Sequence, residues 1–445
     1  MSKRIEELKL RCIYPHFQKF LQGHPDLDAH LKIYLVGNYT MPPSLALPII
    51  AALTPPEVEF NLTDDNIHQP LDYDEKVDLV AISFFTPQAQ RAYVIADEYR
   101  KRKTKVILGG IHPTSIPQEA LQHADAICIG EVEPVWHQIL EDCAKGELKR
   151  IYQATEDYSL SDFPIPKRDI FLRDVYKWDA HLVLTTRGCS VKCGGCPIPN
   201  KEGTHVRLRP VNNIIEDIKS MPYKEFYFAD DTVMLPGKKY TNFLLKIMEK
   251  TEELDVKIFL ASTMMMNHDP EFYRKLKKGG ACSMYTIFGF DRISRKLLSP
   301  DCTADEWQKG IDLVRMNEDA GIHFYASFGI GFDEQDKGVF DRILKFSEES
   351  GIDLAEFYII TPFPGTPLGE QMARENRILH RNYSVWNHGN IVFKPKNFTE
   401  QELMDGFYYL WKSFYKNKEH KDTLRSFTIN QTAIADSKQG NYESQ

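Results

Sequence analysis

The sequence lacks the features that mark a membrane protein, a secreted protein or a nucleic-acid-binding protein. No stretch approaches the roughly 20 consecutive apolar residues that a membrane-spanning helix needs. The charged start, MSKRIEE, does not resemble a signal peptide. There is no long block of lysine and arginine, and the net charge of −8 gives no positive field for nucleic acid. The sequence therefore predicts a cytoplasmic protein with no membrane span and no nucleic-acid partner.

A disulfide framework is also missing. Of the eight cysteines, three lie in one short loop and five are scattered. The scattered cysteines are most simply buried apolar residues or unpaired thiols in a reducing compartment, and their spacing argues against a second cluster. By contrast, 42% hydrophobic residues in a chain of 445 are enough for sizeable cores in two or three domains.

The most informative motif is a loop with three cysteines, Cys189, Cys193 and Cys196, which follows an apolar run at 182–186. Three thiolates at spacings of four and three can reach three corners of one iron–sulfur cube, because sulfur ligands suit iron clusters. One iron would then stay open to a substrate or cofactor. Structural zinc is the alternative, but it normally takes four protein ligands, and no second cysteine pair lies near.

This loop resembles the CxxxCxxC signature of the radical S-adenosylmethionine (SAM) enzymes. The resemblance implies a [4Fe–4S] cluster whose open iron binds the amino and carboxylate groups of SAM. Reductive cleavage of SAM then yields a 5′-deoxyadenosyl radical, which abstracts hydrogen from an unactivated carbon. One residue departs from the family pattern, since the position before the third cysteine is usually aromatic and packs near the adenine, whereas here it is Gly195.

The first 150 residues alternate short β-rich runs with helical stretches, a pattern typical of a parallel sheet covered by helices. Ligands of such sheets bind at the carboxyl ends of the strands, where glycine allows close approach. Gly109 and Gly110 follow one expected strand and Gly130 follows the next. The expected strands are 32–36, 58–62, 79–83, 105–109 and 126–129.

The same stretch resembles the cobalamin-binding domain that precedes the radical domain in one large radical SAM subclass. The matching segments are Thr86-Pro-Gln with Arg91-Ala-Tyr93, 109–114 and 130–133, which makes Gly109, Gly110 and Gly130 candidate cobalamin-binding residues. The Asp-x-His-x-x-Gly motif, which supplies a lower histidine ligand in other cobalamin proteins, is absent. A cofactor-free remnant of this domain is the alternative, and His112 is expected to be a turn or surface histidine.

Six further strand–helix units, with strands near 182–186, 225–229, 256–261, 284–289, 323–328 and 355–360, suit the partial (β/α)6 barrel of radical SAM enzymes. The expected fold class is therefore α/β, with a Rossmann-like parallel-sheet domain followed by a partial barrel and a small helical C-terminal region. The expected boundaries are 1–150 for the cobalamin-binding-like domain, 151–178 for a linker, 179–370 for the barrel, 371–425 for a C-terminal extension and 426–445 for a flexible tail.

Several candidate SAM-binding residues follow the barrel strands, where the chemistry of this family takes place. Asp230 and Asp231 end the second strand, and a carboxylate there can pair with the SAM ammonium group, although either residue could instead cap the next helix. Asp291 lies where family members commonly carry Gly-x-Glu. Gly329 and Gly331 would let the backbone approach adenosine, or serve simply as turn glycines.

Three arginines, Arg187, Arg207 and Arg209, flank the cysteine loop. They could bind carboxylates of SAM or substrate, or lie at the surface. The segments 361–367 and 377–396 continue the resemblance to the same subclass.

Three functions remain open on the sequence. One is radical oxidation or hydroxylation of a methyl group, another is cobalamin-dependent C-methylation, and the third is a non-enzymatic regulator. The resemblance to tetrapyrrole- and hopanoid-modifying relatives, among them a bacteriochlorophyllide C-7 methyl oxidase, favours oxidation of a tetrapyrrole methyl in bacteriochlorophyll biosynthesis. It also implies a large apolar substrate and a reducing electron donor such as flavodoxin or ferredoxin.

Overall fold

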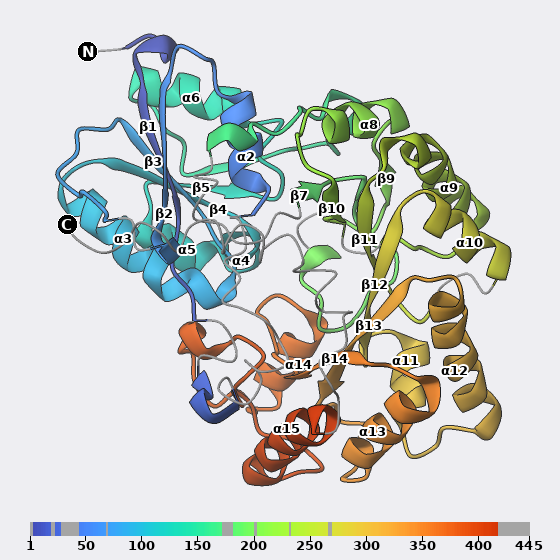
Figure 1. Cartoon of the computed structure of the whole chain (residues 1–445). Coiled ribbons are helices and arrows are strands. Elements are labelled where there is room, and N and C mark those ends of the chain that lie inside the picture. The colour runs from blue at the N-terminus through green and yellow to red at the C-terminus, as the bar shows by residue number, and fades with distance from the viewer. Residues whose placement is uncertain are drawn as a thin grey trace, which may run out of the picture.

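The protein folds into two lobes, each built on a six-stranded parallel sheet (Figure 1). The computed structural model describes residues 3–18, 23–27, 44–67, 70–170, 181–199, 203–230, 233–265 and 269–416. The strand expected at 32–36, part of the linker at 171–180 and the tail at 426–445 lie outside these residues. Within the described residues, the parallel α/β architecture predicted from the sequence is confirmed.

Sheet A forms the first lobe, with strand order β2-β1-β3-β4-β5-β6. The strands expected at 58–62, 79–83, 105–109 and 126–129 correspond to β2 to β5, whereas β1 and β6 were not predicted. β6 pairs with β5 and carries the sheet past the expected domain boundary at residue 150. The strands are β1 (Lys9–Tyr14), β2 (Glu59–Asp64), β3 (Leu79–Ser83), β4 (Lys105–Gly109), β5 (Ala126–Ile129) and β6 (Ile151–Gln153).

Helices cover both faces of sheet A because successive residues of its buried strands point to opposite faces and are apolar on each face. On β3, Val80 and Ile82 pack with helices α3 and α5, while Leu79 and Ala81 pack with α2 and α6. Figure 1 shows α3 and α5 on one side of the sheet and α2 and α6 on the other. The helices are α2 (Ala46–Leu53), α3 (Ala89–Lys101), α4 (Ile111–Ser115), α5 (Pro117–His123) and α6 (Trp136–Lys145).

Sheet B forms the second lobe, with strand order β14-β13-β12-β11-β10-β7 and every pairing parallel. All six strands therefore end at one edge, as the sequence predicted. The strands are β7 (His181–Val183), β10 (Glu225–Phe228), β11 (Lys257–Ser262), β12 (Ala281–Phe288), β13 (His323–Ile330) and β14 (Leu354–Ile359). A separate two-stranded sheet joins β8 (Thr186–Arg187) to β9 (Arg207–Leu208).

The helices of the second lobe pack on one face of sheet B. Phe288 lies against Phe346 of α13, and Phe357 lies edge-on to Trp411 of α15. The helices are α8 (Val211–Lys219), α9 (Lys238–Thr251), α10 (Pro270–Lys278), α11 (Arg292–Leu297), α12 (Ala304–Asp319), α13 (Val339–Ser350), α14 (Pro367–Arg374) and α15 (Glu400–Tyr415).

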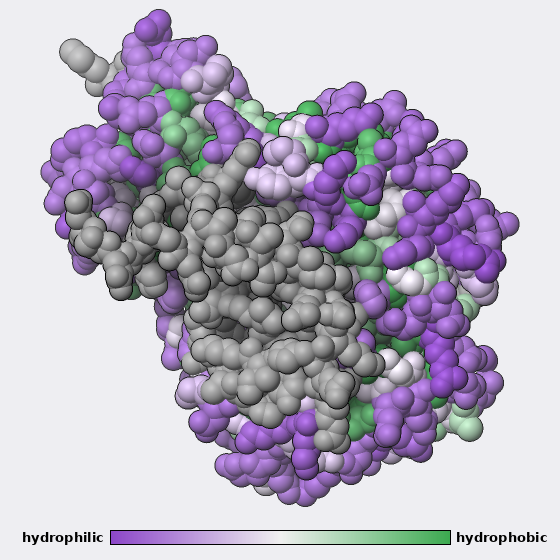
Figure 2. All heavy atoms as spheres, viewed as in Figure 1, coloured by the Kyte–Doolittle hydropathy of each residue, from purple (hydrophilic) through white to green (hydrophobic). Residues whose placement is uncertain are grey.

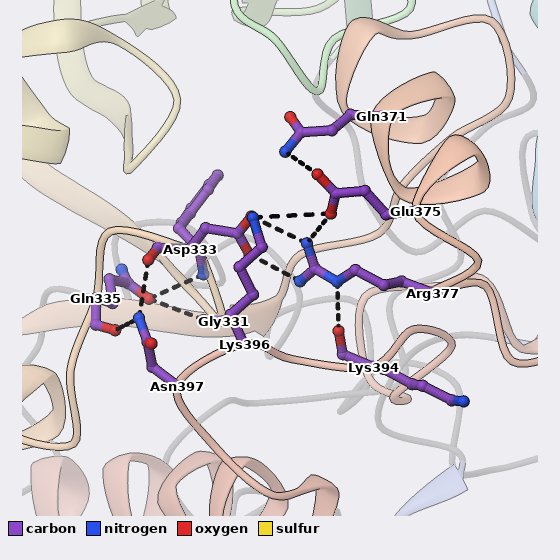
Figure 3. A network of polar contacts seen from close by, with 10 residues as sticks. Gly331, Asp333, Gln335, Gln371, Glu375, Arg377, Lys394, Lys396 and Asn397 are labelled. Carbon is purple, nitrogen blue, oxygen red and sulfur yellow. Dashed lines mark hydrogen bonds and ion pairs between the residues drawn. The ribbon is translucent and has the colours of Figure 1, made fainter.

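A polar network ties the C-terminal segment to the turn after β13 (Figure 3). Arg377 donates two hydrogen bonds to Asp333, at 2.7 and 2.9 Å, and Lys396 forms an ion pair with the same carboxylate at 2.8 Å. Such bidentate arginine–carboxylate pairs fix orientation as well as distance. The network thereby holds the segment around residues 375–397 against the lobe that carries sheet B.

Hydrophilic side chains cover much of the outer surface that is visible in Figure 2. In the part of the chain that the structure describes, no helix combines the length and the apolar character needed to cross a membrane.

Candidate active site

The cysteine loop connects β8 to β9 at the carboxyl edge of sheet B. Cys189 is buried, whereas Cys193 and Cys196 are half-buried. The loop is turned back on itself by a hydrogen bond from the Cys196 N–H to the Cys193 carbonyl, at 3.1 Å. It is also anchored to α14, because the Leu368 N–H donates to the Gly194 carbonyl at 2.9 Å.

The chemistry of this loop fits an iron–sulfur cluster. Burial, followed by the charge of nearby Cys189, raises the pKa of the Cys193 thiol to about 12, so a metal must displace its proton. Among the described residues, no three His, Cys, Asp or Glu side chains are arranged to hold a metal ion. A cluster makes a different demand, because each thiolate binds its own iron rather than one shared ion. The three cysteines remain the predicted ligands.

The aromatic residue missing at Gly195 is replaced in space by a ring from another part of the chain. A Cβ added at Gly195 would lie 2.4 Å from Cε1 of Phe290, which follows β12. The Phe290 ring in turn stacks on Tyr358 with centroids 6.0 Å apart and lies edge-on to Phe332. Sequence analysis missed Phe290, since only the fold brings it beside the loop.

Asp230 holds the backbone that leads into the cysteine loop. Its carboxylate accepts hydrogen bonds from the N–H and hydroxyl of Thr185, at 2.8 and 2.6 Å, and from the N–H of Thr186. Burial raises the pKa of Asp230 to about 6, against the opposing effect of these donors. Asp230 does not cap the next helix, α9, which begins eight residues later at Lys238. Asp231 lies outside the described residues.

Asp291 caps a helix beside the loop. Its carboxylate accepts hydrogen bonds from the N–H groups of Ile293 and Ser294 at the start of α11, at 2.9 and 3.1 Å, and from the Ser294 hydroxyl at 2.5 Å. The acid that follows β12 is therefore explained by its role as a helix cap, and no ligand is needed to account for it. A contact between Asp291 and SAM stays a prediction.

Close packing explains in part the glycines at the carboxyl end of β13, where Gly329 lies within the strand and Gly331 directly follows it. A Cβ at Gly329 would lie 2.7 Å from the hydroxyl oxygen of Tyr358, and one at Gly331 would lie 3.0 Å from Leu403 of α15. Gln335 bridges the two glycines, because its side chain accepts from the Gly331 N–H at 2.8 Å (Figure 3) and donates to the Gly329 carbonyl at 2.9 Å. Their proposed contact with adenosine remains a prediction.

One buried polar group at this edge has no partner among the described residues. The hydroxyl oxygen of Thr361, just beyond β14, is buried and makes no hydrogen bond. A buried hydroxyl without a partner costs free energy, which a polar ligand at this edge would recover. SAM, with its ammonium, carboxylate and ribose groups, fits this requirement.

A cavity of about 350 Å³ lies at the carboxyl edge of sheet A and extends to the second lobe. Gly109, Gly110 and Gly130 all line it, together with Leu184 and Ala229 from the neighbourhood of β7 and β10. At Gly110 (φ +100°) a Cβ would lie 2.6 Å from the Phe84 carbonyl oxygen, so this turn requires glycine. The predicted glycines thus share one mostly apolar cavity at the strand ends, where ligands of such sheets bind.

His112 is buried, so the expectation that it lies at the surface is wrong. It also does not line this cavity. Its Nδ1 lies 3.1 Å from the Thr86 hydroxyl and its Nε2 lies 3.5 Å from Glu119. Its ring packs edge-on against Tyr383, with centroids 4.9 Å apart. His112 therefore joins the first lobe to the C-terminal segment and does not face a ligand in the cavity.

The three arginines near the cysteine loop bind protein carboxylates and are not surface residues; Arg209 pairs with Asp217 at 2.7 Å. Arg207 forms a bidentate pair with Glu131 at 2.6 and 2.8 Å, and Arg187 pairs with both Glu131 and Glu133. The side chains of this group are all at most 10% exposed. The loop after β5, which lines the cavity, is thereby joined directly to the strands that carry the cysteine loop.

Comparisons with known proteins agree with this arrangement. A B12 binding domain model matches residues 42–139, and a radical SAM superfamily model matches residues 183–346. The chain is 28% identical to the bacteriochlorophyllide d C-8(2)-methyltransferase of Chlorobaculum tepidum, over 80% of this chain and 81% of that protein. It is 25% identical to the C-12(1)-methyltransferase of the same organism, over 88% and 87%.

The fold is similar to that of the radical SAM methyltransferase TsrM from Kitasatospora setae, solved with cobalamin and a [4Fe–4S] cluster. The TM-score is 0.63 at 16% identity, covering 84% of this chain and 75% of that one. The two domain matches imply a [4Fe–4S] cluster and SAM as cofactors and support binding of cobalamin. The chain therefore carries a B12-binding domain at residues 42–139 followed by a radical SAM domain at residues 183–346.

Proposed function

We propose that this protein is a cobalamin-dependent radical SAM enzyme that methylates carbon on a tetrapyrrole. The observation that carries the proposal is the cavity at the edge of sheet A, which is lined by the predicted cobalamin glycines and reaches the second lobe. The two Chlorobaculum tepidum relatives named above are bacteriochlorophyllide d methyltransferases, and they favour methylation over the oxidation expected from the sequence.

The residues of the chain have distinct roles in this proposal. Cys189, Cys193 and Cys196 would hold the cluster, and the glycines of the cavity would hold the corrin ring. When bound, the cluster with SAM supplies a carbon-centred radical and the cobalamin supplies a methyl group. Asp230 fixes the backbone before the cysteine loop, and the buried Glu131–Arg207 pair fixes this loop relative to the cavity. Both sets of contacts would act by fixing the orientation of the cysteine loop and the cavity relative to each other.

The same proposal includes a cytoplasmic location and a reducing donor such as flavodoxin or ferredoxin. It also includes a large, mostly apolar substrate. Each of these rests on the family resemblance rather than on a particular contact.

Substitution at Gly109 tests the role of the cavity. Gly109→Leu would place a branched side chain in the cavity, and we expect at least a tenfold loss of bound corrinoid, about 1.4 kcal/mol. Methylated product should fall with it, while 5′-deoxyadenosine formation continues. Corrinoid content is measured by visible absorption after anaerobic reconstitution, and both products by mass spectrometry.

Two variants control for a general effect of added volume. Gly109→Ala should lose much less corrinoid, since its Cβ would make an ordinary 3.7 Å contact with Cys128. Val94→Leu adds a methylene on the exposed side of α3 and should leave all readouts unchanged. A hydroxylated product that carries oxygen from labelled water and forms without cobalamin would contradict the methylation proposal and show that the reaction is an oxidation.

A further inference from the structure

Four polar side chains meet on the face of sheet B that points away from its helices. In the strand register Tyr285 lies beside Tyr325, and Ser327 lies beside Glu356. Residues two apart on a strand share a face, so these four lie on one side of β12, β13 and β14. Residues of the opposite face, such as Phe288 and Phe357, pack against the helices.

The hydroxyl groups of this cluster all donate to one carboxylate. Tyr285 and Ser327 donate to Oε1 of Glu356 at 2.5 and 2.6 Å, and Tyr325 donates to Oε2 at 2.8 Å. A carboxylate offers about four acceptor positions, so one remains on Oε2. In the described part of the chain, no lysine, arginine or histidine forms an ion pair with Glu356.

This arrangement is unusual for a purely structural acid. A carboxylate within a sheet is commonly paired with a cation, whereas the half-buried Glu356 is held by three neutral hydroxyls. Burial, followed by the charge of Glu356, raises the pKa of Tyr285 well above its usual value, so this tyrosine stays protonated and donates. Tyr285, Tyr325 and Glu356 are each partly exposed although they lie within a six-stranded sheet. The rest of the chain therefore covers this cluster only in part.

The cluster lies close to the expected site of radical formation. Tyr358 is two residues beyond Glu356 on β14, and its ring stacks on Phe290, the ring beside Gly195 of the cysteine loop. Two residues along a strand correspond to about 7 Å. A large substrate whose reacting carbon lies near the cysteine loop would place another part of itself over Glu356.

We propose that Glu356, held by Tyr285, Tyr325 and Ser327, is a substrate-recognition residue that accepts a hydrogen bond from a hydroxyl or ammonium group of the substrate. The same oxygen repels a carboxylate, so the acidic substituents of the substrate lie elsewhere. The inference rests on the proposed function, and for a tetrapyrrole it specifies a macrocycle with a hydroxyl-bearing substituent.

Binding of two matched chlorins tests this inference separately from turnover. The reconstituted full-length enzyme is titrated with a chlorin that carries a hydroxyethyl group and with its vinyl counterpart, and binding is followed by chlorin fluorescence. We expect the wild type to bind the hydroxyethyl chlorin about tenfold more tightly. Glu356→Gln should abolish this preference by weakening the hydroxyethyl chlorin alone, and Tyr325→Phe should reduce it.

Glu334→Gln, on an exposed side chain, should keep the wild-type preference. If the wild type binds both chlorins equally and Glu356→Gln changes neither affinity, the inference fails while a tetrapyrrole substrate stands. If the wild type binds neither chlorin, the tetrapyrrole class itself is wrong, and the inference fails with it. A rise in KM for the hydroxyethyl chlorin with unchanged kcat in Glu356→Gln would agree with recognition.

Discussion

Replacing Cys193 by alanine is expected to remove the iron–sulfur cluster and to lower SAM cleavage more than 100-fold. Substitutions beside a metal ligand typically lower metal affinity or activity by about 10- to 100-fold, and removal of a ligand itself should cost more. Three thiolates leave one iron open for SAM, and the loss of one thiolate leaves the cluster with only two protein ligands. Iron and sulfide content, visible absorption and 5′-deoxyadenosine yield under a strong reductant measure the effect.

Cys302→Ala is the matched control, because Cys302 lies outside the loop and its thiol donates to the Thr303 carbonyl at 3.5 Å. It should retain iron and full SAM cleavage. Unchanged iron content in Cys193→Ala, or stoichiometric zinc in the anaerobically prepared wild type, would refute the cluster assignment.

Asp217→Ala is expected to lower the free energy of unfolding by about 3–5 kcal/mol, the cost of leaving a buried charge unpaired. Asp217 is fully buried in α8 and pairs with Arg168 at 2.6 Å and Arg209 at 2.7 Å. The Arg209 side chain is itself 0% exposed and lies over Phe163. Both arginines also donate to carbonyls around β7, so the loss should loosen the backbone before the cysteine loop.

Urea unfolding of the apoprotein measures this effect, with Asp305→Ala as the control. Asp305 pairs with Lys309 on the exposed face of α12, with both side chains more than two-thirds exposed, and such pairs contribute at most about 1 kcal/mol. Equal free energies of unfolding for the two variants would show that the Asp217 ion pairs do not stabilise the fold. A large loss in Asp217→Ala with retained iron would separate stability from cluster binding.

The parts of the site that sequence analysis could predict are those encoded within short segments. The cysteine spacing is local, and the glycines after β4 and β5 mark strand ends at which ligands bind, so both could be identified without a structure. The strands β3, β4 and β5 were also predictable, because they are continuous apolar runs of the kind buried in parallel sheets. β1 was missed, since its alternation with Lys9 and Arg11 weakens that signal.

Residues that act through distant partners could not be predicted. The glycine before the third cysteine indicated only a missing aromatic ring, while Phe290 fills that space from almost a hundred residues away. Arg187 and Arg207 were expected to meet a ligand or solvent, yet they bind Glu131 and Glu133 of the other lobe. The acidic loop 130–133 was visible in the sequence, but its partners were not.

The sequence by itself determined the class of chemistry, because ligand type and spacing in one loop are properties of contiguous residues. It also determined the two parallel sheets, because the alternation of apolar runs with helical segments allows few other architectures. Only the tertiary structure decided which face of sheet B carries Glu356 and its hydroxyl donors, and which arginines are already paired. Those contacts depend on strand register and on the packing of one lobe against the other, which bring together side chains that no local pattern relates.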